Sequence, residues 1–391
     1  MPRCRGRLRN QAEHRSWSVP VSDDAEQRTS VPPKRPSVWW DKGMADRTAP
    51  HVSMLWEAVD AAAALTQRFG FENSTTAAAW VTALLRDHWD LHVETCEAIV
   101  ISDLNALAWV RTQNGAMIAK WSAARQRFAR LDGLAELTAW LAPRGLPVSA
   151  PIPARDRRLQ VERDGFSLGL QRVIPGDLLD VSDPTQVRAA GAMLARLHAT
   201  LATYPRAVPG TPHQEHMLAE TMDGWLRAQP AHVPDRARRA LADGLDLVRE
   251  HPLPVQLLHG DVRASNILWH DGQISALLDF EEARIAPRID ELARSSVLLG
   301  TRFHDWAPVS AQVRAEFVAG YESVRALRPT ERNWWDVLVL WYSLAMIPRG
   351  QDVHGWSASA LEHADLMLGA EHSTAPSALN ADPFDPTEET P

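Results

Sequence analysis

Apolar and polar residues alternate with two different periods along this chain, and the change of period divides it into two parts. Between residues 98 and 173, short apolar runs are separated by turn pairs such as Asn114-Gly115 and Asp164-Gly165, which predicts strands joined by hairpins. One helix is expected within this part over Gln126–Leu141, where apolar residues recur every three or four positions. After Asp183-Pro184, a favoured helix start, the spacing is mainly helical. We therefore predict an α+β fold, with a small antiparallel sheet and a helix in the first lobe and a larger, mainly helical second lobe.

Composition and periodicity set the expected limits of these parts. Residues 1–50 are rich in Arg, Pro and Ser and lack the apolar core of a secretory signal, so we expect a disordered leader. We expect an N-terminal lobe with a helical extension over 51–172, a C-terminal lobe over 173–372 and a loose acidic tail over 373–391. Further helices are expected over Met54–Phe69, Thr75–His88, Thr211–Ala228, Asp235–Glu250, Ser310–Leu327 and Asn333–Ile347. No apolar run approaches the ~18 residues that span a membrane, so we expect a cytoplasmic protein without a membrane partner.

The segment from His259 to Asp279 carries the most informative polar residues. Asp261 and Asn266 follow a short apolar strand, and Asp279 follows a second strand that is joined to the first by the turn Asp271-Gly272. This arrangement predicts that the three side chains meet at one end of a two-stranded unit. Phosphoryl transfer needs charge neutralisation by Mg²⁺ and a positioned hydroxyl nucleophile. Asp261 can orient the hydroxyl and accept its proton, and Asn266 and Asp279 offer the oxygen ligands that Mg²⁺ prefers.

The use of lysine gives independent support for a phosphate site. Of 41 basic residues only three are lysine, and Lys120 is the only lysine from residue 51 onward. It ends the apolar strand Ala116–Lys120, where a compact ammonium group can contact phosphates and pair with a carboxylate. The expected partner is Glu136, sixteen residues later on the predicted helix, with Asp132 as the second choice.

His259-Gly260-Asp261 through Asn266, followed by Asp279-Phe280-Glu281, resembles the aminoglycoside phosphotransferase and choline kinase-like group. The resemblance extends over roughly Ala98–Val324. It implies a bilobal protein-kinase-like fold, with Asp261 as the catalytic base or hydroxyl-orienting residue, and Asn266 and Asp279 as the metal ligands. It also implies ATP, or GTP, and Mg²⁺ as cofactors. In this family the aspartate that corresponds to Asp290 braces the backbone of the catalytic loop.

The same resemblance suggests where the nucleotide would lie. No Gly-rich loop occurs in the N-terminal lobe, and the turn containing Ser102 and Asn105 is the candidate to cover the phosphates. Gln171 and Val173 lie at the expected hinge between the lobes and would offer backbone groups to a purine. His198 lies beside an apolar helix stripe, so we interpret it as a hydrogen-bonded core histidine rather than a ligand.

These features predict an ATP-dependent O-phosphotransferase that acts on the hydroxyl of a small polar, amine-bearing molecule. The acceptor could be an aminoglycoside or peptide antibiotic, or a choline-like or homoserine-like amino alcohol, and Glu281, Glu282 and Asp305 are the candidates to contact its amine. The chain has a net charge of −8, and since residues 1–50 contribute +4, the remainder carries −12, which disfavours nucleic acid as a partner. The alternative is a non-catalytic kinase-like nucleotide-binding module. The presence of the lysine, the base and both metal ligands weighs against that alternative.

Overall fold

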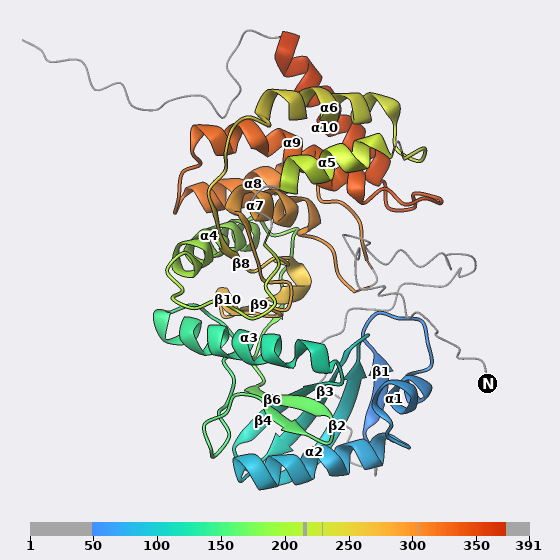
Figure 1. Cartoon of the computed structure of the whole chain (residues 1–391), viewed down its shortest axis with the longest axis vertical. Coiled ribbons are helices and arrows are strands. Elements are labelled where there is room, and N and C mark those ends of the chain that lie inside the picture. Colours follow the sequence, from blue (N-terminus) through green and yellow to red (C-terminus); the bar gives the residue numbers. More distant parts are fainter. Residues whose placement is uncertain (1–48, 214–216, 229, 304, 373–391) are drawn as a thin grey trace, which may run out of the picture.

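The structure is a computed structural model that describes residues 49–213, 217–228, 230–303 and 305–372. The predicted tail, and the predicted leader apart from its last two residues, lie outside this range. Figure 1 shows a sheet with two helices at one end of the molecule and a larger group of helices at the other. The predicted α+β architecture, a small sheet lobe followed by a helical lobe, is confirmed.

The sheet of the first lobe has six strands in the order β1-β2-β3-β4-β6-β5. Its strands are β1 (His51–Met54), β2 (Val93–Ile101), β3 (Asn105–Thr112), β4 (Gly115–Ser122), β5 (Val161–Arg163) and β6 (Phe166–Arg172). All neighbours are antiparallel except β1, which runs parallel to β2. The register places Lys120 on β4 between Leu107 of β3 and Gly169 of β6. Strand β4, which carries Lys120, is therefore hydrogen-bonded to a neighbouring strand on each side, and this pairing fixes the Lys120 backbone.

One predicted helix of this lobe is wrong in its first part. Of the segment predicted as helical from Met54, only Ala61–Phe69 forms a helix, α1; Met54 is the last residue of strand β1, which pairs with the C-terminal end of β2, and residues 55–60 form a loop. The Asp60 side chain caps α1 by accepting from the Ala63 amide at 2.7 Å. The helix thus starts just after the Asp60 cap, seven residues later than predicted. Helix α2 (Ser74–Trp89) agrees with the prediction, with Asn73 as its cap.

The described part of the helical lobe contains two small sheets among its helices. Its helices are α3 (Phe128–Leu141), α4 (Pro184–Leu201), α5 (Met217–Arg227), α6 (Asp235–Val248), α7 (Arg288–Leu298), α8 (Ala311–Glu322), α9 (Pro329–Ala345) and α10 (Trp356–His372). Its strands are β7 (Asp177–Leu178), β8 (Val255–Leu258), β9 (Ile267–His270), β10 (Gln273–Leu277) and β11 (Arg284–Pro287). Strands β10, β9 and β7 form one sheet, and β11 pairs with β8. Helices α7 and α10 were not predicted.

Each lobe has its own hydrophobic core, and α3 packs in the larger core, which belongs to the helical lobe. The smaller core lies between the six-stranded sheet and helices α1 and α2. The buried α3 residues Leu134, Leu137 and Leu141 pack instead with the helical lobe. Gly133 permits this contact, because a Cβ at this position would lie 2.5 Å from the Pro209 ring. Helix α3 is therefore fixed to the helical lobe, although it precedes the end of the sheet in the sequence.

Candidate active site

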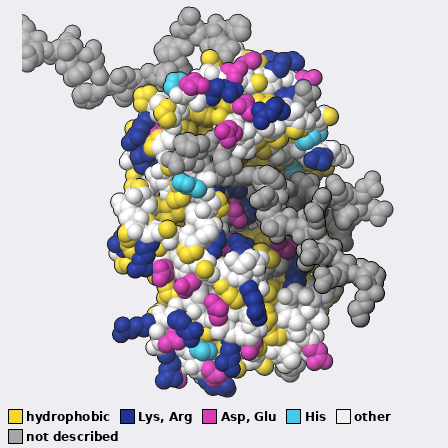
Figure 2. All heavy atoms as spheres, viewed as in Figure 1, with side chains coloured by type: hydrophobic (Ala, Val, Ile, Leu, Met, Phe, Trp, Pro, Cys, Tyr) yellow, Lys and Arg dark blue, Asp and Glu magenta, His cyan; other side chains and the backbone are white. Residues whose placement is uncertain are grey.

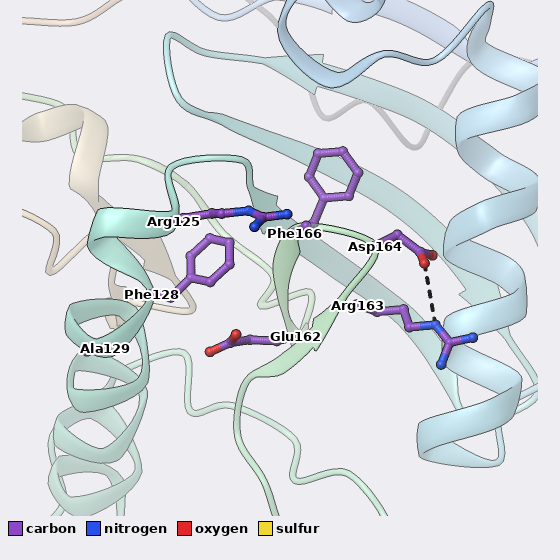
Figure 3. Close-up of a pocket in the computed structure, with 8 residues that line it drawn as sticks. Arg125, Phe128, Ala129, Glu162, Arg163, Asp164 and Phe166 are labelled. Atoms are coloured by element: carbon purple, nitrogen blue, oxygen red, sulfur yellow. Dashed lines mark ion pairs between the residues drawn. The ribbon is translucent and has the colours of Figure 1, made fainter.

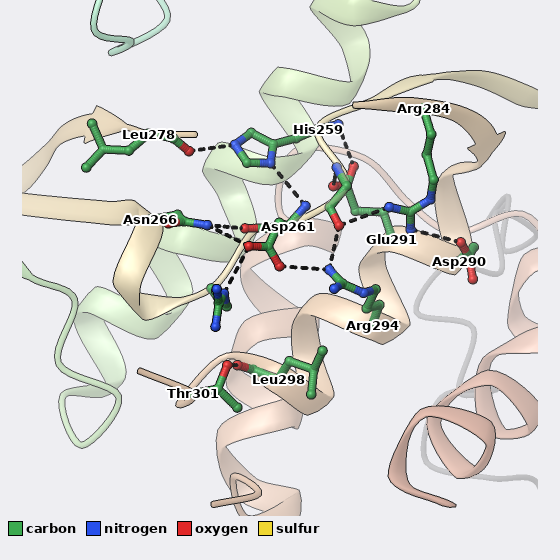
Figure 4. Close-up of polar contacts among 12 residues, drawn as sticks. His259, Asp261, Asn266, Leu278, Arg284, Asp290, Glu291, Arg294, Leu298 and Thr301 are labelled. Atoms are coloured by element: carbon green, nitrogen blue, oxygen red, sulfur yellow. Dashed lines mark hydrogen bonds and ion pairs between the residues drawn. The ribbon is translucent and has the colours of Figure 1, made fainter. Parts of the chain in front are cut away.

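The segment from His259 to Asn266 leaves β8 and turns so that its polar side chains meet (Figure 4). The Asn266 side-chain amide donates to the Asp261 carboxylate at 2.9 Å and to the Asp261 backbone carbonyl at 2.8 Å. The Leu278 amide donates to the Asn266 carbonyl at 2.9 Å, and the His259 ring bonds the Leu278 carbonyl at 2.9 Å. These contacts tie the loop to the residue before Asp279 and bring the three predicted polar residues to one place.

Gly260 allows the loop to turn this sharply. Its φ is +89°, a left-handed value that glycine adopts without the cost imposed by a Cβ. A Cβ there would lie 2.1 Å from the Glu282 carbonyl oxygen and 2.6 Å from the Arg284 guanidinium. The Gly260 carbonyl accepts from Arg284 at 2.9 Å and also from Arg294. Gly260 is thus held between residues 282–284 and helix α7.

Asp261 is buried and lies between two guanidinium groups. Arg263 donates to its Oδ2 at 3.0 Å, and Arg294 donates to its Oδ1 at 3.0 Å. Burial alone would raise the pKa of this carboxyl, but Arg294 and Arg263 outweigh burial and hold the pKa below its ordinary value. Asp261 is therefore ionised at neutral pH, as a proton acceptor must be. Neither arginine was predicted as a site residue.

Glu291 braces the backbone of the loop and was also missed by the sequence interpretation. It accepts from the backbone amides of His259, at 3.2 Å, and Gly260. Its carboxylate also bonds the His198 ring at 2.9 Å, and the other His198 nitrogen bonds the Tyr321 hydroxyl at 2.9 Å. Burial would raise the pKa of Glu291, but the hydrogen bond and charge of His198 lower it to about 2. The interpretation of His198 as a satisfied core histidine is confirmed.

The direct bracing role predicted for Asp290 is wrong. Asp290 accepts from Arg284 at 3.2 Å and from the Tyr342 hydroxyl, so it acts on the loop only through Arg284. The reason is geometric: consecutive residues of a helix point about 100° apart, so in the first turn of α7 only one of the two acidic side chains can face the loop. That residue is Glu291.

The chemistry of the donor set at Asn266 and Asp279 fits Mg²⁺. The Asn266 amide nitrogen is used by Asp261, which leaves the amide oxygen as the available group. Asp279 lies two residues beyond the end of β10 with a positive φ of +59°, and its carboxylate is exposed. Within the described parts of the chain no cluster of three or more His, Cys, Asp or Glu residues could hold a metal. A site of two protein ligands completed by phosphate oxygens is typical of Mg²⁺.

Lys120 points to the same place from the sheet. Its ammonium nitrogen lies 3.9 Å from the Asp279 carboxylate and forms a close ion pair with Glu281. Burial would lower the pKa of Lys120, but Glu281 and Asp279 raise it above its ordinary value, so the ammonium is charged. The structure therefore brings together Lys120, Asp279 and the Asp261–Asn266 loop from separate segments.

The predicted partner of Lys120 is wrong. Glu136 is partly exposed and forms an ion pair with Arg206 at 2.8 Å. Asp132, the second choice, has no ion pair with Lys120 in the described part of the chain either, and it is exposed. Because α3 packs on the helical lobe through Leu134, Leu137 and Leu141, its acidic residues are turned away from the lysine strand.

In the turn predicted to cover the phosphates, Ser102 and Asn105 are hydrogen-bonded to each other. The Ser102 hydroxyl donates to the Asn105 carbonyl at 3.2 Å, and the Ser102 amide donates to the same oxygen at 2.8 Å. The Asn105 side chain donates to both carboxylate oxygens of Glu281, at 2.9 and 3.1 Å. Asn105 thus reaches the Lys120 pair, and its phosphate-binding role stays a prediction.

At the expected hinge, the amide of Val173 is already used by the sheet, and its carbonyl stays the predicted purine contact of this residue. The Val173 amide donates to the Ala116 carbonyl at 3.1 Å, so this donor extends the sheet. Gln171 lies inside β6 opposite Ile118, and it also forms a bridge with Pro151. Its role in nucleotide binding stays a prediction.

The three acidic residues predicted to contact an amine do not form one pocket. Glu281 is taken up by Lys120 and Asn105, which corrects its assignment. Glu282 and Asp305 are exposed, and Asp305 forms a two-hydrogen-bond bridge with the backbone of Arg302. The charges nearest to Asp261 are instead the guanidinium groups of two arginines.

A hollow of about 540 Å³ lies elsewhere, between the β5–β6 hairpin and the start of α3 (Figure 3). It is lined by Arg125, Phe128, Ala129 and residues 162–166. None of the residues of the His259–Asp279 segment lines it, so the hollow is separate from the candidate active site.

Comparison with known proteins identifies the family. Residues 100–332 match the family model described as the phosphotransferase enzyme family. The chain belongs to this family. The resemblance carried by the His259–Asp279 segment is therefore confirmed at the level of the family.

Curated relatives of this phosphotransferase family member include homoserine kinases. The one from Neisseria meningitidis is 26% identical over 208 residues, which cover 51% of this chain and 64% of the relative. The one from Cupriavidus necator is 33% identical over 119 residues, which cover 30% and 34%. The chain thus spans less than two thirds of the length of either relative.

Solved structures support the fold. An aminoglycoside phosphotransferase from Alicyclobacillus acidocaldarius superposes with a TM-score of 0.52 at 16% identity, covering 73% of this chain and 95% of that one. A macrolide 2'-phosphotransferase from Brachybacterium faecium gives a TM-score of 0.52 at 17% identity, covering 80% and 99%. These similarities establish the bilobal fold.

None of the helices in the described residues has the length and apolar character to cross a bilayer. On the face seen in Figure 2, basic and acidic side chains are interspersed instead of forming a patch of one sign. The expected cytoplasmic location stays a prediction.

Proposed function

We propose that this chain transfers the γ-phosphoryl group of ATP to the hydroxyl of a small molecule. The observation that carries the proposal is that three segments meet. The Lys120 ammonium lies 3.9 Å from the Asp279 carboxylate, and the Asn266 amide donates to the Asp261 carboxylate at 2.9 Å in the adjoining loop. A phosphate-binding cation, two oxygen ligands for a metal and an ionised carboxylate are the parts that phosphoryl transfer requires.

Each residue has a role that its contacts support. Lys120 would bind the α- and β-phosphates, and the Asn266 oxygen and Asp279 would hold Mg²⁺, which neutralises phosphate charge when bound. A carboxylate offers about four acceptor positions, and Arg263, Arg294 and Asn266 occupy three on Asp261. One position remains for an acceptor hydroxyl, which Asp261 would orient and deprotonate.

We further propose that the acceptor is a hydroxy amino acid of the homoserine type. Asp261 carries one negative charge and is contacted by two guanidinium groups, so the local charge is positive. Within the described residues, the Arg263 guanidinium bonds Asp261 through its Nε, its terminal nitrogens have no side-chain partner, and its central carbon lies 5.1 Å from the centre of the Trp306 ring. An acceptor carboxylate could bind there. The similarity to homoserine kinases supports this choice over a polycationic antibiotic.

The test is a comparison of acceptors that differ only in the carboxylate. Homoserine and 3-aminopropan-1-ol share the hydroxyl and the amine, and transfer to either adds one phosphoryl group, a mass of about 80 daltons. We expect kcat/KM to be roughly 10- to 100-fold higher for homoserine, since a hydrogen bond to a charged group contributes about 1.5–3 kcal/mol. Equal rates would contradict the carboxylate assignment.

A non-catalytic nucleotide-binding module is the remaining alternative. It would bind Mg·ATP without phosphorylating any acceptor and without hydrolysing ATP. A screen that includes homoserine, 3-aminopropan-1-ol, choline and an aminoglycoside distinguishes the two, and loss of transfer in Asp261→Asn would assign the activity to this site.

A further inference from the structure

The Glu281 carboxylate joins residues from three separate segments. Lys120 on β4 forms a close ion pair with it, and Asn105 on β3 donates to both of its oxygens at 2.9 and 3.1 Å. Arg127, just before α3, lies 3.4 Å from the same carboxylate. The Glu281 side chain is only 14% exposed, so these contacts are largely shielded from water. A carboxylate with this many charged and polar partners has a defined position.

The backbone around Glu281 is held by a second arginine at the start of α3. Arg130 donates to the carbonyl of Glu281 at 2.8 Å and to the carbonyl of Ala283 at 2.7 Å. Its other terminal nitrogen donates to the Gly210 carbonyl at 3.1 Å. The segment that carries Glu281 is thus fixed to α3, which is itself part of the helical lobe. The sheet contributes Lys120 and Asn105.

Glu136 cannot replace Glu281 in this arrangement. A helix rises 1.5 Å per residue, so Glu136 lies roughly 9 Å farther along α3 than Arg130. It is 42% exposed and pairs with Arg206. The carboxylate that contacts the lysine therefore comes from the strand end after Asp279 instead of from the helix.

We infer that Glu281 is the positioning residue of Lys120, and that Glu281 with Asn105 and Arg127 forms a clasp between the sheet and the helical lobe. This inference rests on the proposed function, because it gives Lys120 the task of binding phosphates. The clasp holds the ammonium beside Asp279, where the phosphates and the metal would meet. A lysine has a long flexible stem, so fixing it before the nucleotide arrives reduces the entropy lost on binding.

The test compares Glu281→Gln with Glu136→Gln, the same chemical change in a glutamate that contacts an arginine elsewhere. We expect Glu281→Gln to raise the Kd for Mg·ATP roughly 5- to 30-fold by calorimetry, while Glu136→Gln leaves it unchanged. In a Lys120→Met background, Glu281→Gln should have no further effect, because its role acts through the lysine. Arg127→Gln should weaken binding in the same direction but less, and melting curves verify that each variant is folded.

Two results would overturn the inference. One is unchanged nucleotide affinity in Glu281→Gln. The other is a loss seen with Mg²⁺ but absent when ATP binds in EDTA, since that would make Glu281 a metal ligand. Binding does not depend on finding the acceptor, so failure of the proposed function is observed separately: a protein that binds ATP through the clasp but phosphorylates no acceptor would refute only the proposed function.

Discussion

Replacing Gly260 by alanine should damage both the stability and the activity of this protein. The residue has a φ of +89°, and its new Cβ would lie 2.1 Å from the Glu282 carbonyl oxygen, whereas a contact of at least 3.0 Å is needed. The two segments must therefore separate by about 1 Å, and a misplacement of about 1 Å can reduce catalysis 10²-fold. The neighbour of Glu282 is Glu281, so the displacement reaches the lysine clasp as well as the loop that carries Asp261.

A matched control separates the clash from the backbone strain. Gly272 in the β9–β10 turn has a φ of +76°, but a Cβ there would meet no atom within 4 Å. Gly272→Ala should therefore lower the free energy of unfolding only by the cost of a left-handed alanine, about 1–2 kcal/mol, and should keep its activity. Gly260→Ala should lose more free energy of unfolding in urea and about 10²-fold in kcat/KM. Equal losses of stability in the two variants, with full activity in Gly260→Ala, would refute the assigned role of the glycine.

Three further predictions concern the surroundings of the site and the helical lobe. Burial, together with the charge of Arg314, lowers the pKa of His363 to about 4 from an ordinary 6.5, so the unfolded chain binds the proton first. The contribution of His363 to the free energy of unfolding should be fully present above about pH 6.5 and should fall by on the order of 3 kcal/mol as the pH drops toward 4. In His363→Gln, the free energy of unfolding in urea should depend less on pH over this range. Glu291→Gln keeps the shape of the side chain but removes the charge from the loop brace; we expect a loss of about 1–3 kcal/mol in the free energy of unfolding, and no loss would contradict the bracing role. Arg263→Gln should raise the KM for homoserine more than the KM for ATP, and a selective effect on ATP would place this arginine in the nucleotide site.

Much of the fold followed from local patterns. The turns at Asn114-Gly115 and Asp164-Gly165 fix hairpins through residues that accept positive φ, and the helical spacing of α3 follows directly from its apolar residues. Strand β1 could not be predicted, because its pairing with the end of β2 depends on a contact about 47 residues away in the chain, which local spacing does not encode.

The site was predictable where its residues are close in sequence and was missed where they are not. Asp261, Asn266 and Asp279 share one loop and one hairpin, so their spacing indicated that they meet. The partner of Lys120 depends on how α3 rotates against the helical lobe, which the sixteen-residue interval to Glu136 does not determine. Glu281 was assigned to the acceptor instead. Glu281 and Lys120 are far apart in the sequence, and local spacing does not indicate that they form an ion pair.

The central claim is that Asp261 directs phosphoryl transfer from a nucleotide bound by Lys120 and its clasp. A single-turnover experiment with Mg·ATP and homoserine, comparing the wild-type protein with Asp261→Asn, tests it most directly. We predict that transfer slows by roughly 10²–10⁴-fold while the Kd for Mg·ATP stays the same, as expected for the loss of a general base. Transfer at the wild-type rate in Asp261→Asn would contradict the account.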